Sequence, residues 1–282
     1  MLCVERNVGL DYIAIAYLLQ SLVMTILYHY FTRPLAYRQT WQVQEQIHQL
    51  QLRLRKQNGA APDILLLLQH RPTYTSGRRQ TEELMADEAR RLSTLGADFV
   101  TATRGGQLTY HGPGQVVGYP LIDLARYNPT MGARDYVCRL QTMLQAYLRE
   151  QHGIRHYPHE ETGVFLDAST KIASIGVQLR HRLTSHGFAI NITNEPLAWF
   201  NHIVACGLEG VAAGSVQSQL GTPVQLDAEI PKLVHHFGLR LERDMRPLDM
   251  KDNKSELVSL IRQLEMDAQV SGSWSTAPTS SN

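Results

Sequence analysis

The sequence is poor in cysteine, with only Cys3, Cys138 and Cys206 among 282 residues. Three thiols cannot form a fully paired disulfide framework, and they are too few to hold together a chain of this length. Free thiols persist in a reducing compartment, which the low cysteine content therefore favours.

A metal-binding pattern is also missing, because the chain has no Cys-x-x-Cys pair. The nearest approach to a ligand cluster is His152, His156 and His159, close to Glu160. Structural zinc sites combine closely spaced Cys and His ligands, and no cysteine supports these histidines. We interpret them as part of a polar loop and expect no metal.

The sequence has no excess of charge of one sign. Its net charge is +1, with 43% hydrophobic and 19% charged residues, as in an ordinary globular enzyme. Nothing in this balance favours a nucleic acid or a membrane surface as partner. The Arg-Gly-Gly triplet at 104–106 occurs once, in an apolar context, so we expect no nucleic-acid partner.

Charged side chains are absent from residues 12–31. The segment is long enough to span a membrane, although several polar residues and tyrosines dilute its apolar character. A targeting segment and a packed helix are the alternatives, and the sequence leaves all three open. We expect regular structure to begin near Leu35, and a chain beginning near Thr32 to fold and keep its activity.

Apolar periodicity then predicts both helices and strands. The fold class is α+β or mixed α/β, because strands and helices alternate irregularly. We divide the chain into an N-terminal extension (1–34), a catalytic domain (35–245), and a C-terminal helix with a disordered tail (246–282). The expected helices are 43–58, 84–95, 135–150, 229–237 and 255–265, and the expected strands are 64–68, 98–101, 116–121, 163–166, 172–179 and 186–190.

The densest run of glycine is Arg104-Gly-Gly-Gln-Leu-Thr-Tyr-His-Gly-Pro-Gly-Gln115. Clustered glycines mark a backbone that turns sharply or approaches a ligand closely. The alternative is a plain Gly/Pro turn between two strands. Arg104 could bind an acidic group of a carrier or hold the loop. His111 could orient a carbonyl or be a satisfied structural imidazole.

Two further segments carry residues suited to acyl transfer, Lys171-Ile-Ala-Ser-Ile-Gly176 and Cys206-Gly-Leu-Glu-Gly210. A lone cysteine is usually an inert buried hydrophobe, a role that suits Cys138 on its apolar helix better than Cys206. Lysine beside a thiol lowers the thiol pKa below about 8.5 and raises the thiolate fraction. Cys206 and Lys171 are therefore the candidate nucleophile and its partner.

Together the three segments resemble the octanoyltransferases, the lipoyl(octanoyl) transferases of lipoate biosynthesis. The resemblance runs from about residue 37 to residue 237. Two residues depart from the family pattern: Ala205, where proline is common, and Phe165, where tryptophan is frequent. The resemblance is carried by Arg104-Gly-Gly-x-x-Thr109-Tyr-His111-x-x-Gly114-Gln115, Lys171-Ile-Ala-x-x-Gly176, His186-Gly187-x-Ala189-x-Asn191 and Cys206-Gly207.

The resemblance implies the α+β, mixed-sheet fold of the biotin/lipoate protein ligase catalytic domain. It implies that Cys206 accepts an octanoyl group from acyl carrier protein, with Lys171 tuning the thiol, and passes it to a lysine. The acceptors would be lipoyl domains of 2-oxoacid dehydrogenase complexes and the glycine cleavage H protein. The implied substrate-binding residues are Arg104, Gly105, Gly106, Gln107, Leu108, Thr109, Tyr110, His111, Ser174, Ile175, Gly176, Gly187, Phe188 and Ala189.

We expect no cofactor, because thioester exchange is nearly isoenergetic and transfer to an amine is downhill. An ATP-dependent lipoate or biotin ligase on the same fold is the main alternative, and a non-catalytic acyl-carrier-binding protein is another. The residues that precede the family region suggest a mitochondrial location, with the bacterial cytoplasm as the alternative.

Overall fold

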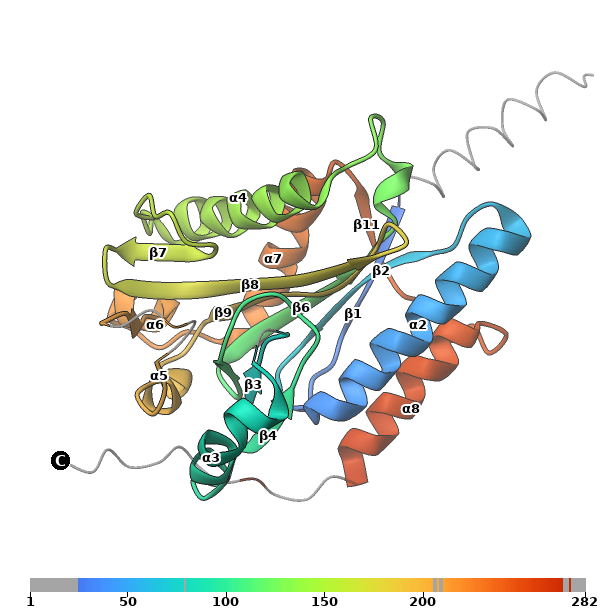
Figure 1. The fold of residues 1–282 in the computed structure, drawn as a ribbon. Helices are drawn as coiled ribbons and strands as arrows, with labels where there is room; N and C mark the ends of the chain where they lie inside the picture. Colours follow the sequence, from blue (N-terminus) through green and yellow to red (C-terminus); the bar gives the residue numbers. More distant parts are fainter. Residues whose placement is uncertain (1–24, 79, 205–206, 208–209, 271–273, 275–282) are drawn as a thin grey trace, which may run out of the picture.

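The computed structural model describes residues 25–78, 80–204, 207, 210–270 and 274. The possible targeting, membrane or helical character of residues 1–24 therefore lies outside the described residues. The same holds for Cys206 and for most of the tail expected to be disordered. The described part consists of two β-sheets and the helices packed around them (Figure 1).

The larger sheet is mixed. Its strand order is β10-β8-β9-β6-β2-β1-β11, with β7 beside β8. Strand β1 is parallel to both β2 and β11, whereas β2, β6, β9 and β8 are successive antiparallel neighbours. Its strands are β1 (Thr25–Tyr30), β2 (Asp63–Leu68), β6 (Gln115–Leu121), β7 (Val164–Asp167), β8 (Thr170–Arg180), β9 (Leu183–Asn191), β10 (Ala212–Ala213) and β11 (Asp244–Pro247).

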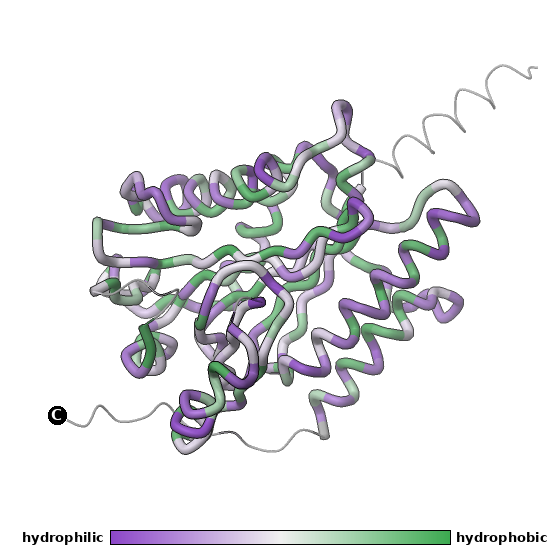
Figure 2. The backbone as a smooth tube through the Cα atoms, in the orientation of Figure 1, coloured by the Kyte–Doolittle hydropathy of each residue, from purple (hydrophilic) through white to green (hydrophobic). Residues whose placement is uncertain are grey.

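Two helix pairs cover opposite faces of this sheet (Figure 1). One pair is α4 (Ala133–His152) and α7 (Leu226–Leu241), and the other is α2 (Tyr37–Asn58) and α8 (Glu256–Val270). Hydrophilic and hydrophobic residues alternate along α2 and α8, as in helices with one face on a core and one in water (Figure 2).

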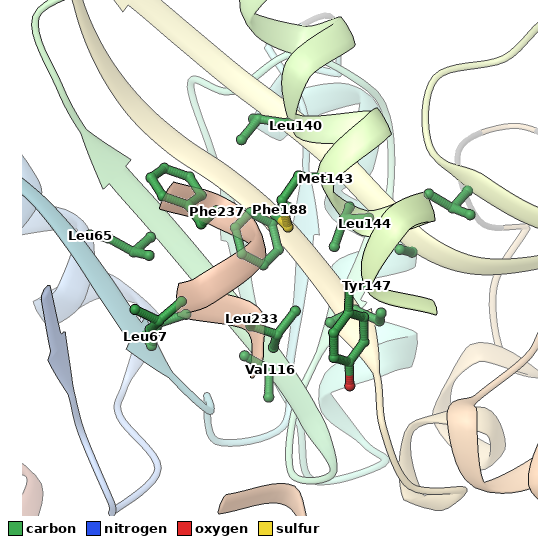
Figure 3. Close-up of a cluster of buried hydrophobic side chains, with 14 of the residues drawn as sticks. Leu65, Leu67, Val116, Leu140, Met143, Leu144, Tyr147, Phe188, Leu233 and Phe237 are labelled. Atoms are coloured by element: carbon green, nitrogen blue, oxygen red, sulfur yellow. The ribbon is translucent and has the colours of Figure 1, made fainter. Parts of the chain in front are cut away.

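The continuous apolar run of strand β2 contributes side chains to two hydrophobic cores, one on each face of the sheet. Its alternating side chains Leu65 and Leu67 pack with Phe237 and Phe188 under α4 and α7 (Figure 3). The other set, which includes Leu66, packs against α2 and α8. A strand with helices on both faces needs a continuous apolar sequence rather than an alternating one.

The smaller sheet has the order β4-β3-β5 and lies beside the C-terminal end of β2. Strands β3 and β4 are parallel and are joined through α3, while β5 is antiparallel to β3. Its own core contains Tyr74, Tyr110 and Trp199, and the rings of Tyr110 and Trp199 stack at 5.3 Å. The remaining elements are β3 (Thr73–Ser76), α3 (Glu82–Ser93), β4 (Asp98–Thr101), β5 (Thr109–His111), η1 (Leu124–Arg126), α5 (Glu195–Phe200) and α6 (Val216–Leu220).

The predicted helices and strands are confirmed, with boundaries that differ by a few residues. Helix α2 ends at Asn58, because Gly59 adopts the left-handed conformation (φ 73°) that stops a helix. The Thr81 side chain accepts a hydrogen bond from the amide of Leu84 and caps α3. The α+β class with a mixed sheet is also confirmed.

The prediction that regular structure begins near Leu35 is wrong. Residues Thr25–Tyr30 form β1, which lies between β2 and β11 in the larger sheet. Ile26 is fully buried there. Residues 25–30 of the charge-free segment are therefore a strand that is paired on both sides. None of the helices in the described ranges is long and apolar enough to cross a membrane.

We predict that removing the buried side chain of Ile26 from β1 destabilises the whole protein. Ile26→Ala should lower the free energy of unfolding by about 2–5 kcal/mol, the cost of a cavity in a core. The exposed Arg33 supplies the control, because Arg33→Ala should change it by less than about 0.5 kcal/mol. Denaturant unfolding measures both, and equal stability of the two variants would contradict a structural role for β1. A chain beginning at Thr32 lacks β1, and we expect it to lose its fold.

Candidate active site

The glycine loop at 104–107 is organised by the side chain of Arg104, which is 6% exposed. Its Nη2 donates to the carbonyl oxygen of Thr75 at 2.6 Å, to Thr75 Oγ1 at 2.7 Å and to the Gln107 carbonyl at 2.9 Å. Its Nη1 donates to the Gly105 carbonyl at 3.0 Å. Of the two roles considered for Arg104, these bonds fit holding the loop.

The loop also lies directly against other backbone segments. The amide of Gly105 donates to the Val177 carbonyl of β8 at 3.2 Å. A Cβ atom on Gly176 would lie 3.0 Å from the Gly105 oxygen, and one on Gly77 would lie 1.8 Å from the Gly106 oxygen. The distance at Gly77 leaves no room for a side chain, and at Gly176 a side chain would fit only if the Gly105 carbonyl moved by a few tenths of an ångström. Gly77 and Gly176 therefore allow the loop to approach β3 and β8.

A cavity of about 40 Å³ lies behind this loop. Three loop residues predicted to bind substrate lie elsewhere: Leu108 and Tyr110 pack in the core of the smaller sheet, and Gln107 faces Gly207. The cavity is lined by Tyr37, Arg104, Gly105, Gly106, Thr109, His111, Val117, Tyr119, Ser174, Ile175, Gly176, His186, Gly187, Phe188 and Ala189.

Tyr37, His111, Tyr119 and His186 line this cavity, and His70 is hydrogen-bonded to Tyr119; we call these five residues the polar wall. Sequence reasoning predicted only His111 among them as a substrate-binding residue. The Nδ1 atom of His70 donates to the Leu35 carbonyl at 3.0 Å, and the Tyr119 hydroxyl donates to its Nε2 at 2.7 Å. The rings of Tyr37 and His111 stack at 5.8 Å. These residues come from α2, β5, β6, β9 and the segment after β2, so no local sequence signal links them.

Burial keeps the histidines of the polar wall neutral near pH 7. Burial lowers the pKa of His70 to about 4 and that of His186 to about 3. The pKa of His111 is also well below its usual value, chiefly through burial and then through His70 and Arg104. The Nδ1 atom of His111 donates to Gln115 Oε1 at 2.8 Å. That bond makes one nitrogen of His111 a satisfied structural group, while the residue still lines the cavity.

Lys171 lies at a second, larger cavity of about 290 Å³. Its side chain starts from β8 and is buried, with 9% exposure. Ser174 and Ala189 line both cavities, so the larger and smaller cavities are neighbours. The larger one is lined by Gln115, Lys171, Ile172, Ser174, Ala189, Asn191, Phe200, Asn201, Ile203, Val204, Gly210, Val211, Ala212 and Ala213.

Cys206 lies outside the described residues, but two described neighbours in the chain lie at the site. Val204 lines the larger cavity. Gly207 has a φ of +67°, and a Cβ atom there would lie 2.0 Å from Gln107 Oε1. The chain on either side of Cys206 is thus close to Lys171's cavity and to the glycine loop.

Cys138 differs from what its helical position predicted. It is exposed on α4, so its description as a buried hydrophobe is wrong. The apolar face of α4 is formed by other residues, such as Leu140 and Leu144, and Cys138 points away from it. It lines neither of the two cavities.

Two of the histidines considered as metal ligands have separate partners. His152, in the last turn of α4, bonds Glu229 Oε2 through its Nε2 at 2.9 Å. His159, in the loop before β7, stacks on Phe165. Within the residues that the structure describes, no group of three His, Cys, Asp or Glu side chains could hold a metal ion.

Known proteins resemble this chain in sequence. Residues 36–238 match the lipoyl protein ligase A/B catalytic domain. An octanoyl-[acyl-carrier-protein]:protein N-octanoyltransferase of Danio rerio, named as mitochondrial, is 40% identical over 177 residues, which are 62% of this chain and 76% of the relative. An octanoyltransferase of Koribacter versatilis is 36% identical over 185 residues, which are 65% of this chain and 73% of the relative.

Solved structures show the same fold at low sequence identity. A lipoate protein ligase from Thermoplasma acidophilum, solved with lipoic acid, gives a TM-score of 0.61 at 19% identity, covering 85% of this chain and 93% of that one. Lipoate-protein ligase A bound with ATP gives a TM-score of 0.60 at 16% identity, and the match covers 88% of this chain and 96% of that one. These likenesses establish the ligase catalytic-domain fold. The family match and the identities of the relatives place this chain in the octanoyltransferase family.

Proposed function

We propose that this chain transfers an octanoyl group from octanoyl-acyl carrier protein to a lysine of a lipoyl domain, through an acyl-Cys206 intermediate. The observation that carries the proposal is the convergence of three distant segments. The glycine loop and Gly176 line the smaller cavity, Lys171 and Val204 line the adjoining larger one, and Gly207 lies against Gln107 of the loop. The names of the relatives support octanoyl transfer as the reaction.

Two displacements make up the proposed reaction. The Cys206 thiolate attacks the carbonyl carbon of the carrier thioester, and the carrier thiolate leaves and takes a proton from Lys171. The acceptor lysine, with an ordinary pKa of about 10.4, must lose a proton before it attacks. Lys171, now neutral, takes that proton. The attacking amine gives its second proton to water as the amide forms and the Cys206 thiolate leaves. Each displacement conserves charge and needs no nucleotide.

The acyl chain would contact the residues predicted to bind substrate that line the smaller cavity. Arg104, in this scheme, acts on the substrate through the loop that it holds. The neutral histidines of the polar wall add no charge near an apolar chain, since an unpaired charge there would be costly.

Location and acceptor choice extend the proposal. Two relatives, from Danio rerio and Xenopus tropicalis, are named as mitochondrial, and we propose the same location for this chain. The proposed acceptors are lipoyl domains of 2-oxoacid dehydrogenase complexes and the glycine cleavage H protein. Cell fractionation and incubation with each acceptor test these two points separately.

Octanoyl-acyl carrier protein should acylate Cys206 in the absence of ATP. The full-length protein should gain one octanoyl group, released by hydroxylamine, because a thioester is more reactive than an amide. Cys206→Ser should lose this adduct. Cys138→Ser is the matched control, because Cys138 is an exposed thiol, and it should acylate normally. Intact-protein mass spectrometry with peptide mapping gives the result. Label on Cys138, or transfer that requires ATP, would overturn the mechanism and favour a ligase.

Lys171→Ala should make Cys206 less reactive. Without the ammonium, the thiol pKa should rise by about one unit or more toward its ordinary value of about 8.5, and alkylation at pH 7 should slow about tenfold. The exposed Lys56 provides the control variant Lys56→Ala, which should alkylate like the parent protein. Rates of iodoacetamide labelling of Cys206 between pH 5 and 10 measure the shift. Superimposable rate–pH curves for Lys171→Ala and the parent would exclude Lys171 from activating the thiol.

A further inference from the structure

Lys171 packs against an aromatic pair that the proposed mechanism does not use. Its Nζ lies 5.2 Å from the centre of the Phe165 ring, within the range of a cation–π interaction. The other partner of that ring is His159, whose imidazole stacks on it at 3.7 Å with an interplanar angle of 8°. His159, Phe165 and Lys171 are thus in successive contact, and Lys171 lines the larger cavity.

The strands fix two members of this stack relative to each other. Phe165 on β7 and Lys171 on β8 are direct cross-strand partners, with irregular register on either side of Phe165. Phe165 is 1% exposed, so its ring is a buried surface of constant position. A buried ring face attracts an ammonium more strongly than an exposed one, because less water competes for the charge.

Gly163 fits the backbone closely around the lysine. A Cβ atom on Gly163 would lie 2.5 Å from Lys171 Cε and 3.1 Å from its Nζ. The residue also has a φ of +131°, which side-chain-bearing residues rarely adopt. The lysine side chain is therefore enclosed between the ring of Phe165 and the backbone at Gly163.

His159 is held against Phe165 by the loop that precedes β7. The amide of Tyr157 donates to the Phe165 carbonyl at 2.7 Å, which ties this loop to the strand. The amide of Glu161 donates to His159 Nδ1 at 3.1 Å, so Nδ1 acts as an acceptor. The imidazole plane is thereby oriented parallel to the ring of Phe165.

We propose that Phe165 and His159 are positioning residues, which hold the ammonium of Lys171 at the larger cavity for acyl transfer. The inference rests on the role proposed for Lys171. The four-carbon stem of a lysine side chain is flexible. Its ammonium therefore stays at one position only if neighbouring groups restrain it. Phe165 restrains the ammonium directly, and His159 does so by covering the ring.

The test combines one signal from Lys171 itself with one from the reaction. The full-length protein is labelled with [13Cε]lysine, and the Lys171 resonance is assigned by its absence in Lys171→Arg. Phe165→Leu and His159→Ala should move this resonance toward that of an exposed lysine, because each disturbs the aromatic surface. Both should lower kcat for octanoyl transfer about tenfold with little change in KM for the acyl carrier substrate.

Matched variants separate positioning from loss of fold. Phe165→Tyr and His159→Phe keep a flat ring at each position, and both variants should have the Lys171 resonance and the kcat of the parent protein. His156→Ala alters a histidine three residues away in the same loop and should change neither. A Lys171 resonance that does not move in His159→Ala or Phe165→Leu would overturn the inference, whatever the activity. A moved resonance with unchanged kcat would also overturn the inference, whereas the role proposed for Lys171 itself is tested separately by alkylation of Lys171→Ala.

Discussion

The close backbone approach between the glycine loop and β8 is the constraint on which the site depends. The loop belongs to the smaller sheet, and β8 belongs to the larger one. Where they meet, Gly105 bonds Val177, and Gly176 leaves space for the Gly105 carbonyl. Arg104 holds the loop in the shape that makes this contact possible. Without this contact between the loop and β8, the smaller cavity would lose one of its walls.

The polar wall shows how the interior near this contact tolerates so many polar groups. A buried charge would be costly unless paired, and His70, His111 and His186 avoid that cost by staying neutral. Gln115 links His111 to Asn191, whose Nδ2 donates to the Gly214 carbonyl. The hydrogen-bond network therefore runs from the smaller cavity to the segment beside β10, where the chain approaches Lys171.

The elements that the sequence predicts well are those with a local cause. A continuous apolar run predicts strand β2. The helical spacing of apolar residues, ended by Gly59, predicts α2, and the capping residue Thr81 marks the start of α3. Strand β1 was missed because its identity depends on pairing with β2 and β11, which lie far along the chain. A charge-free segment alone cannot distinguish a central strand from a helix.

The same distinction applies to the site. Glycines that allow close approach are visible as a cluster at 104–115, and the motif order identifies the family. Of the polar wall only His111 was predicted as a site residue, and the stack of His159 on Phe165 was not predicted, because the members of each group come together only through tertiary packing. The roles of Cys206 and Lys171 remain predictions, carried by the motif and by the neighbours that the structure places around them.

The central claim is that the contact between the glycine loop and β8 assembles the site, and Gly176→Ala tests it most directly. The added Cβ would press on the Gly105 carbonyl at 3.0 Å and displace the loop by a few tenths of an ångström. The rate of acyl-enzyme formation from octanoyl-acyl carrier protein, measured in a single turnover, should fall about tenfold or more, because small misplacements are costly in catalysis. Gly132→Ala, whose Cβ would have only an ordinary contact at 3.6 Å, should retain the parent rate. A parent-like rate in a folded Gly176→Ala protein would contradict the claim.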